Sequence, residues 1–245
     1  MTAVYDRIGL GYADVRRPDP RLAALITTAL ADARSILNVG AGAGSYEPPD
    51  REVVAVEPSQ VMLNQHPGIR RVRGSAEALP FRSGSFDAAM AVMTVHHWPD
   101  LLAGLREMTR VARRQVVFTW DPDFERELWV VTDYLPEIRQ IEHARFTPLQ
   151  DVVDALGAHP VLRFDIPWDF TDGYQPAFWR RPEAYLEPSI RAASSTFAQL
   201  PSSVVDPAMD RLRDDLRSGA WQKRHRDLLT SDRIDFGYRL VGAGE

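Results

Sequence analysis

The stretch SILNVGAGAG, residues 35–44, determines the fold class of this chain. Its first five residues form an apolar run typical of a strand that is buried on both faces of a parallel sheet. Gly40, Gly42 and Gly44 follow at alternate positions, where the absence of a side chain lets the backbone turn sharply and approach a ligand. A dinucleotide fingerprint would need its third glycine at position 45, which is Ser45. The stretch therefore predicts a strand and a ligand-binding turn, with a plain tight turn as the alternative.

The first half of the chain repeats this pattern of apolar runs separated by helical spacing. Strands are predicted at residues 53–57, 69–74, 86–92 and 115–120, and helices at 20–33, 58–65 and 99–112. Because strands alternate with helices, we expect an α/β, Rossmann-like doubly wound sheet, whose ligand sites lie beyond the carboxyl ends of its strands.

The second half of the chain is less regular. The pattern predicts a helix at 147–157 and strands at 161–169 and 233–242. About 60 residues separate those two strands, which is too many for a structureless loop in a compact domain. We expect them to form a helical cap inserted between the last two strands.

The composition excludes several classes of protein. The 245 residues, 44% of them hydrophobic, suit one globular domain, and the lack of cysteine excludes disulfides, thiolate metal sites and cysteine nucleophiles. A net charge of -5 argues against nucleic-acid binding, and no apolar stretch has the length of a membrane span or the place of a secretory signal. We expect a cytoplasmic protein that binds neither nucleic acid nor membranes.

Glu57 follows the second predicted strand, 17 residues beyond Gly40. An acidic side chain at that place can accept hydrogen bonds from both hydroxyls of a ribose, although it could instead cap the next helix before Pro58. A third segment, GSAEALPF at 74–81, is followed by SFD at 85–87 and leads into the next strand.

The pieces NVGAGAG, VVAVEPS, GSAEALPF, SFDAAMAVMTVHHW and LREMTRVAR leading to QVVF resemble, in order and spacing, the class I S-adenosylmethionine-dependent methyltransferases, in particular their small-molecule branch. The resemblance covers residues 1–120 and implies a seven-stranded sheet with its last strand antiparallel. It also implies S-adenosyl-L-methionine as the cofactor. The residues that it places at the cofactor are Gly40, Gly42, Gly44, Glu57, Ser75, Ala76, Glu77 and Met93, with the ribose on Glu57 and the adenine along 75–77.

Two departures from the family pattern concern the cofactor. Ser75 stands where the family usually has an aspartate, and it should hold the adenine amino group more weakly because it is neutral. Pro48 and Pro49 cannot continue a helix, so the helix between the first two strands should be shortened or absent. In related enzymes the amino-terminal segment folds over the cofactor, so Tyr12 and Arg16 are candidates to supply the missing charge, with packing and solvation as the alternative.

The pair His96-His97 follows the fourth predicted strand, beside the expected position of the transferred methyl group. Histidine can remove a proton near neutral pH, as methylation of a hydroxyl requires, and some sugar O-methyltransferases are similar in having paired histidines here and an aspartate after the fifth strand, which would be Asp121. Either histidine could instead pack or cap the next helix. No metal-ligand spacing occurs, and we predict no catalytic metal.

We therefore expect a single methyltransferase domain over 1–245, with a cofactor-binding core at 1–120, the rest of the core at 121–168, an acceptor cap at 169–231 and a last strand at 232–245. The acceptor is predicted to be a small molecule methylated on oxygen, nitrogen or carbon, oxygen being slightly favoured, and the protein a monomer or homodimer. The cap aromatics and arginines could contact the acceptor or form the core of the cap; these are Trp168, Phe170, Trp179, Arg180, Arg181, Tyr185 and Trp221. The rival hypotheses are a protein that binds S-adenosylmethionine or S-adenosylhomocysteine without methyl transfer, such as a sensor or a cyclase, and an NAD-dependent oxidoreductase.

Overall fold

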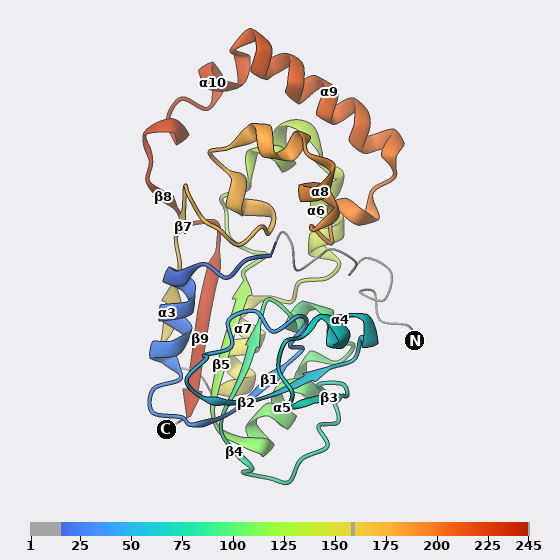
Figure 1. Cartoon of the computed structure of the whole chain (residues 1–245). Coiled ribbons are helices and arrows are strands. Elements are labelled where there is room, and N and C mark those ends of the chain that lie inside the picture. Colours follow the sequence, from blue (N-terminus) through green and yellow to red (C-terminus); the bar gives the residue numbers. More distant parts are fainter. Residues whose placement is uncertain (1–15, 158–159, 245) are drawn as a thin grey trace.

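A mixed seven-stranded sheet forms the lower half of the molecule in Figure 1, a computed structural model that describes residues 16–157 and 160–244. Its strand order is β3-β2-β1-β4-β5-β9-β6. The strands are β1 (Ser35–Val39), β2 (Glu52–Glu57), β3 (Arg71–Arg73), β4 (Phe86–Val92), β5 (Ala112–Trp120), β6 (Val161–Arg163) and β9 (Tyr238–Gly244). The first five strands run parallel, while β9 is antiparallel to both β5 and β6. The predicted seven-stranded sheet with an antiparallel last strand is confirmed.

The strand register brings the predicted ligand-binding ends together at one edge of the sheet. Asn38 of β1 lies opposite Ala55 of β2 and opposite Met90 of β4. The chain therefore leaves these three adjacent strands at the same edge, which places Gly40, Glu57 and Met93 close to one another.

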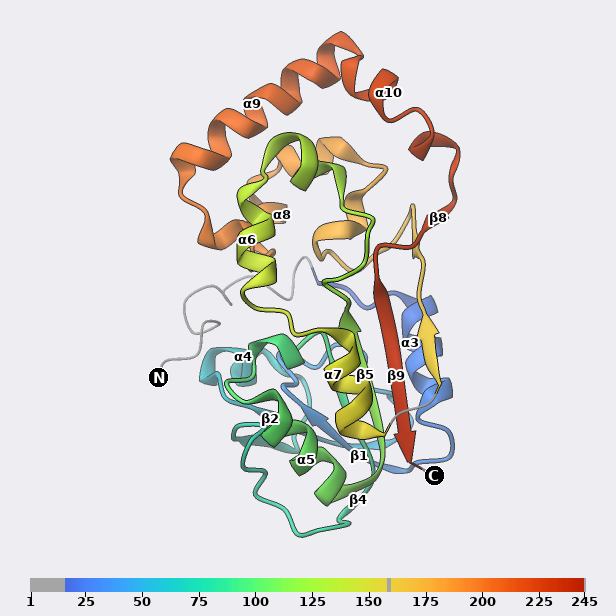
Figure 2. The ribbon, with the colours of Figure 1, turned by 180° about the vertical axis from the view of Figure 1, so that it is seen from behind.

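Helices cover both faces of the sheet, as a doubly wound fold requires. In Figure 2, α5 (Leu101–Val111) and α7 (Leu149–Leu156) lie over one face, and α3 (Pro20–Ala29) lies on the other face. A further helix, α4 (Gln60–Gln65), follows β2. The apolar residues of β1 alternate between the two faces: Ile36 belongs to the cluster with α3 and Leu37 to the cluster with α5. The strand is buried on both sides, which explains its continuous apolar sequence.

Local signals set the ends of several of these helices. Asp19 caps α3 by accepting a hydrogen bond from the backbone N–H of Arg21, and Pro20 is the first helical residue. The helix ends at Ala29 rather than at the predicted residue 33, because Ala31 already has a φ of 49°. Between β1 and β2 the chain forms turns and no helix, as its two prolines predict.

Two predicted strands are each broken into two pieces. Residues 161–169 form β6 and β7 (Ile166–Pro167), and residues 233–242 form β8 (Arg233–Ile234) and the start of β9. Gly237 provides the bend before β9 with a φ of 85°, and a side chain there would meet Phe124 at 2.7 Å. The short strands β7 and β8 pair with each other and leave the main sheet.

Above the sheet lies a second body of helices, which we call the upper layer (Figure 1). Most of it comes from the chain between β7 and β8, including α8 (Pro188–Ala192), α9 (Ser202–Ser218) and α10 (Ala220–Arg224), with 3-10 turns at Gln175–Phe178, Pro182–Leu186, Phe197–Gln199 and Leu228–Thr230. Figure 2 shows that α6 (Glu137–His143) belongs to the same layer, and the π-helical turn Val130–Tyr134 precedes it. The upper layer thus includes residues that precede the predicted cap.

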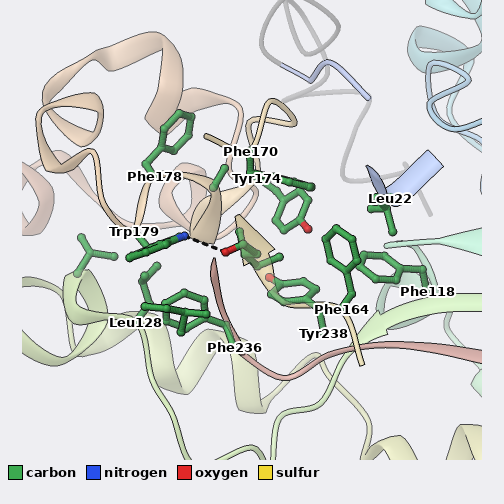
Figure 3. Packing of buried hydrophobic residues seen from close by; sticks show 14 of the residues in the cluster. Leu22, Phe118, Leu128, Phe164, Phe170, Tyr174, Phe178, Trp179, Phe236 and Tyr238 are labelled. Carbon is green, nitrogen blue, oxygen red and sulfur yellow. Dashed lines mark hydrogen bonds between the residues drawn. The ribbon is translucent and has the colours of Figure 1, made fainter. Parts of the chain in front are cut away.

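Most of the aromatic residues singled out in this layer form its own core. Trp179, Trp221 and Tyr185 are almost fully buried, and Trp179 Nε1 donates to the carbonyl of Ile166 (Figure 3). The Arg181 guanidinium donates to backbone carbonyls within the same layer. These side chains are committed to packing and hydrogen bonds inside the layer, which agrees with the packing alternative.

No helix within the described ranges is both long and apolar enough to cross a membrane.

Candidate functional site

A cavity of about 410 Å³ opens at the carboxyl ends of β1, β2 and β4. The predicted site residues that line it are Arg16, Gly40, Gly42, Glu57, Met93 and His97, together with the segment 75–77. Gly44, His96 and Asp121 do not line it, and Tyr12 lies outside the described residues.

The glycines of the turn have different roles. Gly40 has a φ of 72°, and a Cβ there would lie 2.1 Å from the Oγ1 of Thr94. Gly42 has a φ of 54° and faces the cavity, with ordinary space for a side chain beside Met62. Gly44, at a φ of 85°, is packed against His66, 2.8 Å from the position a Cβ would take. The first two glycines therefore shape the cavity, whereas the third allows the turn to pack on the residue beneath it.

Glu57 is buried at the cavity wall with 6% of its surface exposed. One carboxylate oxygen accepts a hydrogen bond from the N–H of Gly42 at 3.0 Å, and the other accepts from the N–H of Ser59 at 2.9 Å. The carboxylate thus holds the glycine turn and faces the cavity at once. Each oxygen of a carboxylate can accept a second hydrogen bond, so ribose binding and turn anchoring are compatible.

A buried polar cluster supports the glycine turn from below, where related folds would have a helix. Glu47 accepts from the side-chain amide of Asn38 and from Nε2 of His66, both at 2.9 Å. Because the N–H of Gly68 donates to Nδ1 of His66, the imidazole proton resides on Nε2. His66 is thus a buried packing residue beneath the turn.

The segment 75–77 forms another part of the cavity wall. Ala76 is buried, while Glu77 accepts from the N–H of Asp100 at the start of α5 at 3.4 Å. Met93 follows β4 and has a φ of 51°, a backbone conformation that residues other than glycine seldom adopt. Its N–H donates to the carbonyl of Phe118, which fixes this turn against the end of β5.

Arg16 is joined to the upper layer through Asp172, a residue that sequence reasoning missed. Asp172 is 1% exposed and forms a two-point ion pair with Arg16, the second contact being Nη2 to Oδ2 at 3.2 Å. The hydroxyl of Tyr46 donates to the same carboxylate at 2.8 Å. Tyr46 also lines the cavity. The charge of Arg16 is thus balanced within the protein, so its guanidinium is not solely a counter-ion for a ligand carboxylate.

His97 lies at the cavity wall beside Arg145 of the chain that follows α6. The guanidinium donates to Nδ1 of His97 at 2.7 Å, which leaves the imidazole proton on Nε2. Burial, and then the positive charge of Arg145, lowers the pKa of His97 to about 3. His97 is therefore neutral at physiological pH, and its Nε2–H can donate a hydrogen bond rather than accept one.

His96 points away from the cavity lining and packs against aromatic rings. Its ring stacks on Phe146 with centroids 4.0 Å apart and lies 4.0 Å from the ring of His97. Burial, and to a lesser extent the positive charge of Arg145, holds the pKa of His96 well below its ordinary value. Its Nδ1 is buried and has no hydrogen-bond partner among the described residues.

Asp121 follows β5 as predicted, but its carboxylate accepts the N–H of Asp123 and closes a turn. The structure does not place it at the cavity. Asp87, from the SFD motif, lies at the opposite edge of the sheet, where it accepts hydrogen bonds from the backbone and hydroxyl of Ser35. Within residues 16–157 and 160–244 no group of three acidic, histidine or cysteine side chains could hold a metal ion.

Comparisons with known proteins find similarity to methyltransferases. A family model described as a methyltransferase domain matches residues 37–119. A solved structure, a putative methyltransferase from an antibiotic biosynthesis pathway of Anabaena variabilis, is 30% identical, with a TM-score of 0.87 over 94% of this chain and 99% of that one. The cyclase SpnF shares the fold, with a TM-score of 0.57 at 14% identity over 100% of this chain and 97% of its own.

An uncharacterized methyltransferase of Bacillus subtilis, YcgJ, is 28% identical over 54% of this chain and 58% of its own length. A further uncharacterized methyltransferase, from a Mycobacterium species, is 35% identical over 33% of this chain and 35% of its own. The chain thus spans between about a third and three fifths of these curated relatives.

Proposed function

This chain belongs to the class I S-adenosylmethionine-dependent methyltransferases, and on that premise we propose that it transfers the methyl group of S-adenosylmethionine to a small-molecule acceptor. The observation that carries the proposal is the cavity at the carboxyl ends of β1, β2 and β4, where the glycine turn and the buried carboxylate of Glu57 converge. A side chain at Gly40 would collide with Thr94, so the glycine is what allows the turn to take its place at the cavity.

When bound, S-adenosylmethionine supplies a methyl group on a positively charged sulfur. In this proposal Glu57 accepts from the ribose hydroxyls while it holds the N–H of Gly42 in place. Ser75, Ala76 and Glu77 form the wall for the adenine. The glycine turn and Met93 line further parts of the cavity.

On the acceptor side of this proposal, His96 and His97 do not remove a proton from the acceptor, and the protein acts by positioning the nucleophile. Both histidines have pKa values held below the ordinary range, so neither is matched to general-base work near neutral pH. His97, oriented by Arg145, offers its Nε2–H as a donor. Alignment of the acceptor atom with the methyl group and sulfur can itself supply much of the acceleration. We therefore no longer favour oxygen over nitrogen or carbon as the acceptor atom.

The low pKa values of both histidines favour one second candidate, a protein that binds the cofactor or its demethylated product without methyl transfer. Weakly basic histidines would suit a scaffold for another reaction as well as an aligning methyltransferase. Asp121 is not needed in either case, since it lies away from the cavity.

One experiment separates the two candidates. The purified protein is titrated calorimetrically with S-adenosylhomocysteine and with NAD, and is then incubated with methyl-labelled S-adenosylmethionine and a panel of small hydroxy, amino and enol acceptors. We expect binding of S-adenosylhomocysteine, no binding of NAD, and acceptor-dependent release of S-adenosylhomocysteine. Tight cofactor binding with no turnover of any acceptor would favour the second candidate, and binding of NAD alone would refute both.

A further inference from the structure

A second, smaller cavity of about 70 Å³ lies above the carboxyl end of β5, between α6 and the 3-10 turn Gln175–Phe178. One water molecule requires about 10–15 Å³ of such space, so a head group of a few atoms can enter. Its wall contains the aromatic side chains Trp120, Phe124, Phe146, Phe236 and Tyr238, and the titratable side chains Arg126, Glu127, Arg139, Glu142 and His143. An aromatic enclosure of this kind attracts positive charge through the negative faces of its rings.

Two polar groups in this cavity have no partner within the described part of the chain. The carboxylate of Glu142 makes no hydrogen bond, and burial raises its pKa to about 7. The side-chain oxygen of Gln175 is buried and accepts no hydrogen bond. A buried acceptor without a donor is rare in native proteins, so Gln175 calls for a ligand that donates, and the partly exposed carboxylate of Glu142 lies in the same cavity.

The neighbouring charges do not neutralise Glu142. Arg139 is held by Glu127 through two hydrogen bonds, at 2.6 Å and 2.5 Å, and is therefore already paired. Arg126 is exposed at the rim, and Arg145 acts on Glu142 only at a distance. A cation that enters the cavity would be the first group to pair directly with this carboxylate.

Two side chains stand between this cavity and the cofactor cavity. His96 touches Phe146 of the small cavity and His97 of the large one, with both ring centroids at 4.0 Å. Tyr174 and Tyr238, both labelled in Figure 3, have ring centroids 5.2 Å apart, and the guanidinium of Arg16 lies 5.4 Å from the centroid of the Tyr174 ring. Nδ1 of His96 and the hydroxyl of Tyr174 are both buried, and among the described residues neither has a hydrogen-bond partner. The boundary between the cavities is thus closed by packed side chains that carry two unpartnered polar atoms.

We propose that the small cavity recognises a protonated amine of the methyl acceptor, with Glu142 as its counter-ion and the surrounding rings as its cage. The acceptor would reach the methyl group by displacing the side chains of His96 and Tyr174, which separate the two cavities, so that the recognised amine is not the atom that is methylated. This inference rests on the proposed function, because it names the class of acceptor that the same site selects.

The test uses the full-length protein saturated with S-adenosylhomocysteine and three probes of equal length: propylammonium, 1-propanol and propionate. Trp120 reports binding through its fluorescence, at constant chloride concentration and near neutral pH, where an alkylammonium stays protonated. We expect saturable binding of propylammonium alone, weakened at least about fivefold in Glu142→Gln. The matched control is Glu137→Gln, an exposed carboxylate on the same helix, which should bind as the unmodified protein does.

A third variant, Phe146→Leu, removes one ring of the cage without changing any charge and should also weaken propylammonium binding. The inference is overturned if Glu142→Gln binds propylammonium as tightly as the unmodified protein, or if 1-propanol binds equally well. Because these titrations need no turnover, they stand apart from the proposed function. An intact amine site in a protein that methylates no acceptor would refute only the transfer, whereas methylation of neutral acceptors undisturbed by Glu142→Gln would refute only the amine site.

Discussion

Replacing Glu57 by glutamine tests the centre of the cofactor site. The substitution keeps the size of the side chain but removes its charge and turns one of its two acceptor oxygens into a donor. In the structure both oxygens accept from backbone N–H groups, those of Gly42 and Ser59, so a glutamine must leave one of these buried donors opposite another donor. The free protein should therefore lose about 1–3 kcal/mol of stability.

Besides this loss of stability, Glu57→Gln should bind the cofactor more weakly. A hydrogen bond to a charged acceptor contributes about 1.5–3 kcal/mol, so S-adenosylhomocysteine should bind roughly 10- to 150-fold more weakly to Glu57→Gln. Calorimetry measures the affinity and urea denaturation the stability. Glu52→Gln is the matched control: Glu52 lies at the start of the same strand, its side chain is 70% exposed, and it pairs with Arg70 at the surface, so neither quantity should change appreciably. An affinity for S-adenosylhomocysteine within threefold of the unmodified protein would remove Glu57 from the site.

Three further substitutions test the turn, the link to the upper layer and the buried carboxylate. Gly40→Ala should lower the melting temperature and the cofactor affinity more than Gly84→Ala, because both positions have positive φ but only the former would drive a Cβ into Thr94; equal effects would contradict a close approach there. Asp172→Asn should cost about 3 kcal/mol in urea denaturation by breaking a buried ion pair, while the exposed Asp169→Asn should cost less than about 1 kcal/mol; a small loss in both would show that the pair is dispensable. The pKa of Glu142 is raised to about 7 from 4.5, so the folded protein keeps the Glu142 proton to a higher pH than the unfolded chain does, and the stability of the fold should fall as pH rises from about 4.5 to 7. Glu142→Gln should therefore be more stable than the unmodified protein at pH 8 but not at pH 4. A stability difference that does not change with pH would refute this reasoning.

Local signals in the sequence were sufficient for the core of the fold. The run 35–39 is a strand because each of its residues can be buried on one face or the other, and Asp19 and Pro20 begin a helix through their own backbone preferences. The turn at 40–44 was equally readable, since the conformations of its glycines are ones that few other residues adopt.

What the sequence could not reveal were contacts between distant segments. Arg16 and Asp172 are 156 residues apart, and nothing near either residue indicates the other. The same is true of Arg145, whose contact with His97 decides which nitrogen carries the proton. Sequence reasoning therefore placed His97 near the site but assigned it the character of a base. The neutral, donating histidine in the structure is a consequence of tertiary packing.

The position of β9 has a consequence for how the protein is made. This strand follows every other strand in the chain, yet it lies between β5 and β6. Until residues 238–244 are synthesised, β6 has no neighbour in the main sheet. Over the same period one edge of β5, whose residues are mostly buried in the folded protein, is unpaired, and other chains could join it. At about 5–20 residues per second, the 118 residues from the end of β5 at 120 to the start of β9 at 238 take roughly 6–24 s to synthesise. The nascent chain must remain unaggregated for that interval, and any ribosomal pause between these two strands prolongs it.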